Sequence, residues 1–272
     1  MTVRNIKLII QYDGSDYHGW QIQPGQKTIQ GTLSDVIQNL IGCKVQVFGA
    51  SRTDAGVSAL GQVALAQIDS PIPTENLAKA ITDRLPADIV ITEAVEMPNG
   101  FDIIGAATRK LYRYTIFTGP TRPALQIRHC WYIPAELDTV AMDRAAKMLV
   151  GKKDFKSFAS AADKRQNSVR TIFQCDVNAS CEKKRQKPTA DIQRFAPGEI
   201  EGTQYDSDWI YVNVEGNAFL YNMVRNIVGT LIEVGKGKLE PEKIKQIIEA
   251  KDRTAAGPIA PAAGLCLVWI KY

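Results

Sequence analysis

The sequence predicts an α+β fold in which two similar halves are built on one largely antiparallel sheet. Two patterns indicate this fold class. Predicted strands and helices alternate in a mixed order along all 272 residues, and several strands follow one another through short, hairpin-like connections. A chain of this length can bury a substantial core without disulfides or metals. No repeat in the sequence itself demonstrates that one half duplicates the other.

The first half is predicted to contain strands and helices in turn. Its opening strand is a compact, β-branched run that ends at the turn pair Asp13-Gly14. The first helix is indicated by apolar residues at helical spacing and by Gly42, which lies where a helix C-cap belongs. The predicted elements are strand 5–12, helix 28–41, strand 44–48, strand 61–68, helix 74–85 and strand 88–95.

The second half repeats this plan. Residues 181–207 are rich in Lys, Gln, Pro and Gly and have almost no apolar pattern, so we expect a surface excursion between two strands. Residues 254–264 form a small-residue connector whose two prolines exclude a helix. The predicted elements are strand 111–117, helix 139–149, strand 171–177, strand 209–214, helix 219–234, helix 241–250 and strand 265–271.

Composition is that of an ordinary globular protein, with 45% hydrophobic and 23% charged residues. No apolar run approaches the ~18 residues that a membrane-spanning helix needs, and the first residues lack a secretory signal. We therefore expect a cytoplasmic protein without a membrane partner. Five cysteines without C-x-x-C spacing and only two histidines predict reduced thiols and no metal site.

Charge is only mildly positive, at +4 with a pI near 8.7, which does not by itself indicate a polyanionic partner. Its distribution is more informative, because Lys and Arg gather in clusters of the kind that phosphate contacts require. Solvated faces and loops are the alternative explanation for these clusters. They lie at residues 109–113, 152–156, 164–165 and 181–187.

The segment ASRTDAGVSA, residues 50–59, contains a candidate for chemistry. Arg52 and Asp54 lie two residues apart in a tight loop, and Gly56 is free to take a backbone conformation that other residues avoid. Side chains at this spacing need not pair with each other, so each can address a ligand or a distant partner. The alternative is that Asp54 only caps the turn.

Two further positions suit a site for a nucleic-acid base. Arg225 lies at the border of a broad apolar face of helix 219–234. It either snorkels to water or is partly buried with a carboxylate partner, for which Asp54 is a candidate. In KLYRY, Tyr112 and Tyr114 share one face of a strand beside basic residues. A flipped base can stack on such a ring, although a core tyrosine pair is equally compatible.

These motifs resemble the tRNA pseudouridine synthase A family, in order and over almost the whole chain. The resemblance rests on RTDAGV together with YDGSDYHGWQIQP, TIQGTL, KLYRY, NAFLYNMVRNIVGTLIEVG and KDRTAAGP. It implies the pseudouridine synthase fold, with α/β halves at 1–105 and 106–272, an insertion at 181–207 and an active cleft between the halves around a central sheet. It also implies a homodimer that acts on tRNA without a metal or cofactor.

The resemblance assigns roles to four residues. Asp54 matches the nucleophilic aspartate, and Arg52 matches the arginine that helps to extrude and replace the target base. Tyr112 matches the tyrosine that stacks on the uracil, and Arg225 matches the basic residue that pairs with the aspartate. An opposed arginine is expected to keep the carboxylate ionised. For a chain with RTDAGV, the implied activity is conversion of uridine to pseudouridine in the anticodon stem-loop of tRNA, at positions 38, 39 and 40.

Some alternatives remain open at this point. Ser51 and Ser58 stand where the family commonly has glycine and histidine, so the contacts of that histidine are not carried over. Attack of Asp54 on ribose C1′, attack on uracil C6 and assisted glycal formation are all compatible with the sequence. A synthase for other tRNA positions and a non-catalytic tRNA-binding protein or chaperone are the alternative functions. Simple binding would not need a nucleophile, which disfavours the chaperone. A methyltransferase would need a Gly-rich nucleotide loop and a deaminase would need zinc ligands. The sequence shows neither feature, which disfavours both enzymes.

Overall fold

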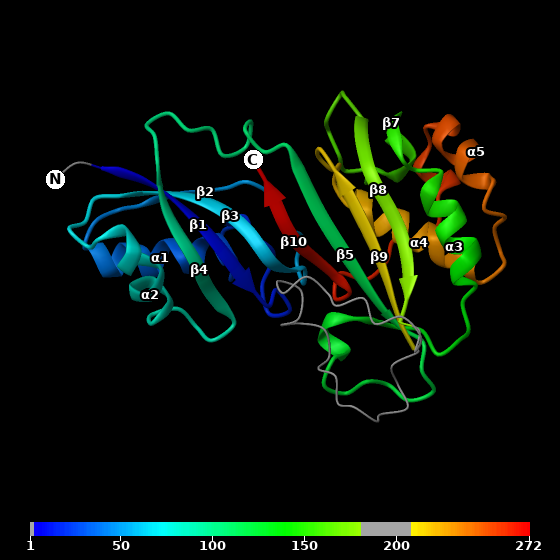
Figure 1. The fold of residues 1–272 in the computed structure, drawn as a ribbon, viewed down its shortest axis with the longest axis horizontal. Helices are drawn as coiled ribbons and strands as arrows, with labels where there is room; N and C mark the ends of the chain where they lie inside the picture. The colour runs from blue at the N-terminus through cyan, green and yellow to red at the C-terminus, as the bar shows by residue number, and fades with distance from the viewer. Residues whose placement is uncertain (1–2, 181–207) are drawn as a thin grey trace.

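The computed structural model describes residues 3–180 and 208–272, so the predicted insertion at 181–207 lies outside the described residues. In the described part, ten strands form a single sheet (Figure 1). The strands are β1 (Arg4–Tyr12), β2 (Gln46–Gly49), β3 (Ser58–Ile68), β4 (Ile89–Met97), β5 (Arg109–Phe117), β6 (Trp131–Tyr132), β7 (Gly151–Asp154), β8 (Val169–Ala179), β9 (Trp209–Gly216) and β10 (Leu265–Lys271).

The sheet is largely antiparallel, as the sequence predicted. Hydrogen-bonded neighbours run in the order β4-β1-β3-β10-β5-β9-β8-β7, while β2 pairs with β3 and β6 with β5 off this path. Among the described strands, only β3 with β10 and β5 with β6 pair in parallel. The strand nearest the C-terminus, β10, therefore lies in the middle of the sheet, between strands from the two halves of the chain.

The helices gather in two groups along the sheet. Figure 1 shows α1 and α2 beside the strands β1 to β4, and α3, α4 and α5 beside β7, β8 and β9. One hydrophobic cluster includes buried side chains from both groups and from most strands. In the described residues, no helix is both long and apolar enough for a membrane span. The helices are α1 (Ile29–Ile41), α2 (Thr74–Thr82), α3 (Thr139–Lys147), α4 (Met223–Gly235) and α5 (Lys243–Ala250).

Local sequence determines both ends of α1. The hydroxyl of Thr28 accepts a hydrogen bond from the N–H of Gly31 at 3.2 Å, which caps the first turn. Gly42 adopts a left-handed φ of 76° and donates its N–H to the carbonyl of Gln38 at 2.8 Å. Left-handed backbone is readily available to glycine, so the predicted C-cap is confirmed.

The two halves meet at a short parallel ladder between β3 and β10. Cys266 pairs with Ser58, and Leu267 pairs with Ala59. This junction follows directly after the loop at 50–57, which joins β2 to β3. The loop that carries Arg52 and Asp54 is therefore placed beside the second half of the chain.

The predicted helix 219–234 begins too early. In the structure α4 starts at Met223, and Asn222 before it has a left-handed φ of 60°. Phe219 and Leu220 continue the apolar pattern because both pack against the core from a non-helical turn. Periodicity alone does not distinguish apolar turn residues from a first helical turn.

Several short elements also differ from the predictions, among them one 3-10 helix and two strands. The connector expected to lack helix contains a 3-10 helix, η4 (Arg253–Ala255), at its start. Its first turn is capped by Asp252, whose side chain accepts from the N–H of Thr254 at 2.9 Å, and Pro258 follows only after it has ended. Strands β6 and β7 were not predicted, because two and four residues are too few to show a periodic pattern.

We expect Gly229→Ala to destabilise the fold by about 1–3 kcal/mol or more, the range for forcing extra volume into a packed interior. A methyl group on Gly229 of α4 would lie 1.7 Å from the carbonyl oxygen of Pro258. Urea denaturation measures the effect, and Gln246→Ala on the exposed face of α5 is the control. If Gly229→Ala unfolds at the same urea concentration as the wild type, the close packing of α4 against the connector is wrong.

Candidate active site

A cleft of about 900 Å³ opens between the loop after β2, strand β5 and the turn before α4. This volume is at the upper end of the usual range for small-molecule sites, so it can accommodate a nucleotide. The four residues singled out from the sequence all line it. Its charged and aromatic lining includes Arg52, Asp54, Lys110, Tyr112, Lys164, Arg165, Phe219, Tyr221 and Arg225.

The loop that carries Asp54 rests on buried polar side chains. The side-chain amide of Gln62 on β3 donates to the carbonyl of Ser51 at 2.7 Å. The hydroxyl of Tyr12 on β1 bonds to the hydroxyl of Thr53 at 2.7 Å. Both Gln62 and Tyr12 are fully buried, and buried polar groups of this kind fix a backbone because they lose free energy when left unpaired. The shape of the loop is thus set before any ligand arrives.

The loop forms a turn through backbone hydrogen bonds in which the Asp54 carboxylate takes no part. The carbonyl of Asp54 accepts the N–H of Val57 at 3.1 Å, and Gly56 takes the left-handed φ of 77° that the sequence suggested. The side chain faces Arg225 and not the turn. The alternative in which Asp54 only caps the turn is therefore not supported.

Asp54 and Arg225 form an ion pair across the cleft, with Nη1 of Arg225 3.5 Å from Oδ2 of Asp54. Two further contacts hold the guanidinium. Its Nε donates to the carbonyl of Ala260 at 2.8 Å, and its Nη1 donates to the side-chain oxygen of Asn222 at 3.1 Å. Only 17% of the Arg225 side chain and 24% of the Asp54 side chain are exposed. The carboxylate partner expected for Arg225 is therefore present.

Burial raises the pKa of Asp54, and the positive charge of Arg225 only partly offsets this rise. Arg225 favours the ionised carboxylate, as expected from the sequence, but the effect of burial on the pKa was not part of that expectation. Water removed from a carboxylate disfavours the charged form, and here that loss outweighs the single cation. The result is a carboxylate of higher basicity than an ordinary aspartate.

Tyr112 lies at the floor of the cleft. Its hydroxyl bonds to the hydroxyl of Ser51 at 3.1 Å, and its ring meets the edge of Phe219 at a centroid distance of 5.2 Å and an angle of 87°. Burial raises the pKa of Tyr112 to about 12, so the phenol is protonated near neutrality. Tyr114 shares the face as predicted, but its hydroxyl donates to the carbonyl of Pro261 within the core.

Lys110 was not singled out from the sequence as a site residue, although it lines the cleft. Its ammonium donates to the carbonyl of Ala50 at 2.7 Å, which ties β5 to the start of the Asp54 loop. Burial lowers the pKa of Lys110 to about 8. Only its place two residues before Tyr112 on the same strand, and so on the same face, could have indicated it.

The remaining predicted residues differ in how they are held. Arg52 is exposed at the cleft and makes no hydrogen bond or ion pair with the residues that the structure describes. Ser58 accepts a hydrogen bond from the N–H of Gly14 at 3.1 Å, so it secures the turn after β1.

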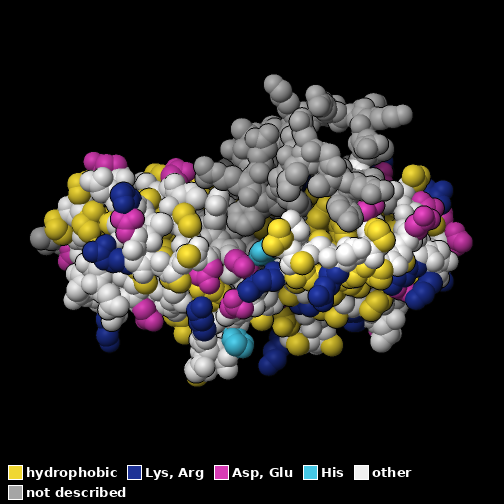
Figure 2. Space-filling model, turned by 90° about the horizontal axis from the view of Figure 1, so that it is seen from below, with side chains coloured by type: hydrophobic (Ala, Val, Ile, Leu, Met, Phe, Trp, Pro, Cys, Tyr) yellow, Lys and Arg dark blue, Asp and Glu magenta, His cyan; other side chains and the backbone are white. Residues whose placement is uncertain are grey.

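In the described part of the chain, no three His, Cys, Asp or Glu side chains are grouped as metal ligands. On the face seen in Figure 2, Lys and Arg side chains are scattered among acidic and apolar ones.

Known proteins resemble this chain along almost its whole length. Residues 8–103 and 145–272 match the profile of the tRNA pseudouridine synthase family. The chain is 40% identical to the tRNA pseudouridine synthase A of Caldicellulosiruptor bescii, 38% to that of Caldicellulosiruptor saccharolyticus and 43% to that of Acetivibrio thermocellus. Each match extends over 270 residues and covers 99% of this chain and 100% of the relative.

Asp54→Asn is expected to stabilise the protein near pH 7. Because the folded-state pKa of Asp54 is raised above its ordinary 3.8, folding favours the protonated form. The contribution of Asp54 to the free energy of unfolding is thus greatest below that ordinary value. It falls as pH rises through the raised pKa. Asparagine does not titrate. The free energy of unfolding of Asp54→Asn relative to wild type therefore increases with pH between the ordinary and the raised pKa, and is constant at higher pH.

Urea denaturation at several pH values between about 4 and 7 measures this difference. Asp35→Asn, on the exposed face of α1, is the matched control for loss of a carboxylate. A free energy of unfolding that changes with pH equally in Asp54→Asn and wild type would contradict the raised pKa.

Proposed function

The chain belongs to the tRNA pseudouridine synthase A family, and from this premise we propose that it converts uridine to pseudouridine in tRNA with Asp54 as the nucleophile. It is an isomerase, because substrate and product differ only in which atom of the base is joined to the ribose. The observation that carries the role of Asp54 is its ion pair with Arg225, partly buried in a cleft that can hold a nucleotide.

The reaction breaks the bond between uracil N1 and ribose C1′, turns the base and joins C5 to C1′, while C5 loses its proton and N1 gains one. A carboxylate suits this exchange because it can attack carbon and later leave, which divides one difficult step into easier ones. Attack at C1′, attack at C6 and removal of a proton to form a glycal all require the ionised carboxylate. Arg225, held by Asn222 and Ala260, orients the carboxylate for any of these routes.

The target base must leave its stack to reach Asp54, at a cost of a few kcal/mol. We propose that Arg52 occupies the space that the base vacates, since its side chain is exposed and unpaired among the described residues. We assign Tyr112 to the inner wall against the uracil, where its protonated hydroxyl stays bonded to Ser51. Lys110 then supports the loop from β5.

Substrate choice and assembly extend the proposal. Positions 38, 39 and 40 of the anticodon stem-loop are the proposed targets, because modification of several neighbouring positions suits selection by shape and flexibility. We also propose a cytoplasmic homodimer whose protomers divide into halves at residues 1–105 and 106–272. Support for this division comes from the sheet, where β4, β1 and β3 lie on one side of β10 and β5, β9, β8 and β7 lie on the other.

A tRNA-binding chaperone is the competing function. Burial of an ionisable carboxylate is unfavourable, and a protein that only held RNA would gain nothing from placing Asp54 in its binding cleft. Incubation of the purified protein with unmodified tRNA transcripts, followed by mapping of pseudouridine at nucleotide resolution, decides between the two. Pseudouridine is expected within the anticodon stem-loop. Bound but unmodified tRNA would support the chaperone instead.

Asp54→Asn should lower turnover by at least about four orders of magnitude, the scale of losing a catalytic nucleophile. Binding of tRNA should change little, because phosphate and stacking contacts supply most of the affinity. Single-turnover assays and filter binding measure the two effects, with Asp35→Asn as the matched control. Substantial pseudouridine formation by folded Asp54→Asn protein would rule out the nucleophile assignment.

Arg225→Gln should move the acidic limb of the pH profile of kcat/KM to higher pH. Loss of the cation removes the interaction that lowers the pKa of Asp54, so more alkaline solution is needed to ionise the carboxylate. A displacement of about one pH unit is expected for a charge at this distance. Arg84→Gln, an exposed arginine outside the cleft, is the control. An acidic limb at the wild-type pH would mean that Arg225 does not act on Asp54.

A further inference from the structure

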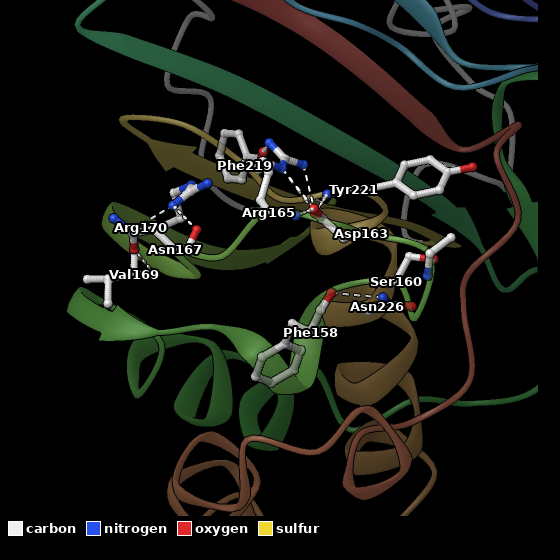
Figure 3. A network of polar contacts seen from close by, with 11 residues as sticks. Phe158, Ser160, Asp163, Arg165, Asn167, Val169, Arg170, Phe219, Tyr221 and Asn226 are labelled. Atoms are coloured by element: carbon white, nitrogen blue, oxygen red, sulfur yellow. Dashed lines mark hydrogen bonds and ion pairs between the residues drawn. The ribbon is translucent and has the colours of Figure 1, made fainter.

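Tyr221 is an aromatic side chain of the cleft that the proposed reaction does not use. It lies in the turn just before α4, one residue before Asn222, and 45% of it is exposed. Figure 3 shows its ring directed away from the polar network that surrounds its backbone. An aromatic ring exposed in a cleft for RNA calls for a specific explanation.

The backbone of Tyr221 is fixed on both sides by the neighbouring loop at 160–168. Its N–H donates to Oδ2 of Asp163 at 2.8 Å, and its carbonyl accepts the N–H of Ser160 at 2.9 Å (Figure 3). Both polar groups of the peptide are therefore satisfied by one loop. The ring is carried on an anchored segment although it is itself exposed.

Asp163 is held in place by Arg165. The guanidinium donates to both carboxylate oxygens through Nε and Nη2, and its Nη1 donates to the carbonyl of Phe219 at 3.1 Å. These hydrogen bonds keep the pKa of Asp163 well below its usual range, so the clamp stays charged at neutral pH. A ring on a clamped backbone loses little conformational freedom when a ligand stacks on it.

Two other aromatic rings of the cleft, those of Tyr112 and Phe219, pack against each other. Tyr112 is only 6% exposed, and Phe219 packs edge-on against it. Among the Phe, Tyr and Trp rings described in the cleft, Tyr221 is therefore the most exposed, and the imidazole of His18 is the other exposed ring there. Lys164 in the adjacent loop lines the same cleft and supplies positive charge there, whereas the charge of Arg165 is paired with Asp163. Exposed rings next to cations are the typical surface for unpaired nucleotides, which stack their bases and contact the cations through phosphates.

We propose that Tyr221 is the stacking platform for a nucleotide adjacent to the target uridine. This inference rests on the proposed function. The target base must lie at Asp54, and among the described contacts Tyr221 has none with Asp54 and is linked to it through Asn222 and Arg225. A base on Tyr221 is thus a neighbour of the target in the RNA, and its stacking holds the strand while the uridine is turned out. Because every base has a flat face, such a platform accepts several sequences.

The test uses an anticodon-arm RNA in which the fluorescent base 2-aminopurine replaces each nucleotide next to the target in turn. Full-length wild type, Tyr221→Phe, Tyr221→Leu and Tyr221→Ala are compared at saturating protein. Phe48→Ala is the matched control, because Phe48 on β2 is also 45% exposed but does not line the cleft. Stacking on an aromatic ring quenches this fluorophore, so the readout reports ring contact and not only affinity.

Wild type and Tyr221→Phe should quench one of the probes, since both keep the ring. Tyr221→Leu and Tyr221→Ala should lose that quenching and bind the RNA roughly 5- to 100-fold more weakly, the range for removal of one stacked base. Phe48→Ala should behave as wild type. Circular dichroism checks that the variants are folded. If Tyr221→Ala is unfolded, the result for Tyr221→Leu decides the outcome.

Quenching by Tyr221→Leu that equals that of the wild type, or no quenching of any probe by the wild type, would overturn the platform. The same proteins are assayed for pseudouridine in the unlabelled RNA. If the wild type forms pseudouridine and Tyr221→Leu quenches as strongly as the wild type, only the stacking role of Tyr221 is contradicted. A wild type that forms no pseudouridine removes the proposed function, and the fluorescence then still shows whether Tyr221 stacks on bound RNA.

Discussion

A carboxylate that has lost part of its hydration needs a positive charge nearby, and the elements around Asp54 bring Arg225 to that position. Arg225 is carried by α4 and held by Asn222 before it and by Ala260 in the connector to β10. The Asp54 loop belongs to the other half of the chain and is fixed by buried groups of β1 and β3. The ion pair therefore depends on the position of one half relative to the other.

Few strand pairings join the two halves, although the position of Asp54 relative to Arg225 depends on them. Two residue pairs between β3 and β10 form the direct ladder, and β10 pairs on its other side with β5. Contacts across this junction are polar as well as apolar, because Lys110 of β5 reaches the carbonyl of Ala50 and Tyr112 reaches Ser51. Loop, ladder and tyrosine thus form one connected unit around the cleft.

Much of this arrangement could be predicted from the sequence, and the failures have physical causes. Long elements with strong patterns, such as β1 and α1, were predicted closely, and the pairing of Arg225 with Asp54 was anticipated as a candidate. The start of α4 was wrong because Phe219 and Leu220 are apolar turn residues. The roles of Gln62 and Lys110 depend on the way the loop after β2 folds back onto β3 and β5. The net pKa shift of Asp54 depends on burial, which no local pattern reports.

The central place of β10 has a consequence for biosynthesis. About 200 residues separate the end of β3 from the beginning of β10, so at roughly 5–20 residues per second a ribosome needs on the order of 10–40 s between them. Throughout that interval β3, and β5 once it has been synthesised, lack β10 as a neighbour, and unpaired strand edges invite association with other chains. The nascent chain therefore passes through a period of exposure that ends only when β10 has emerged from the ribosome.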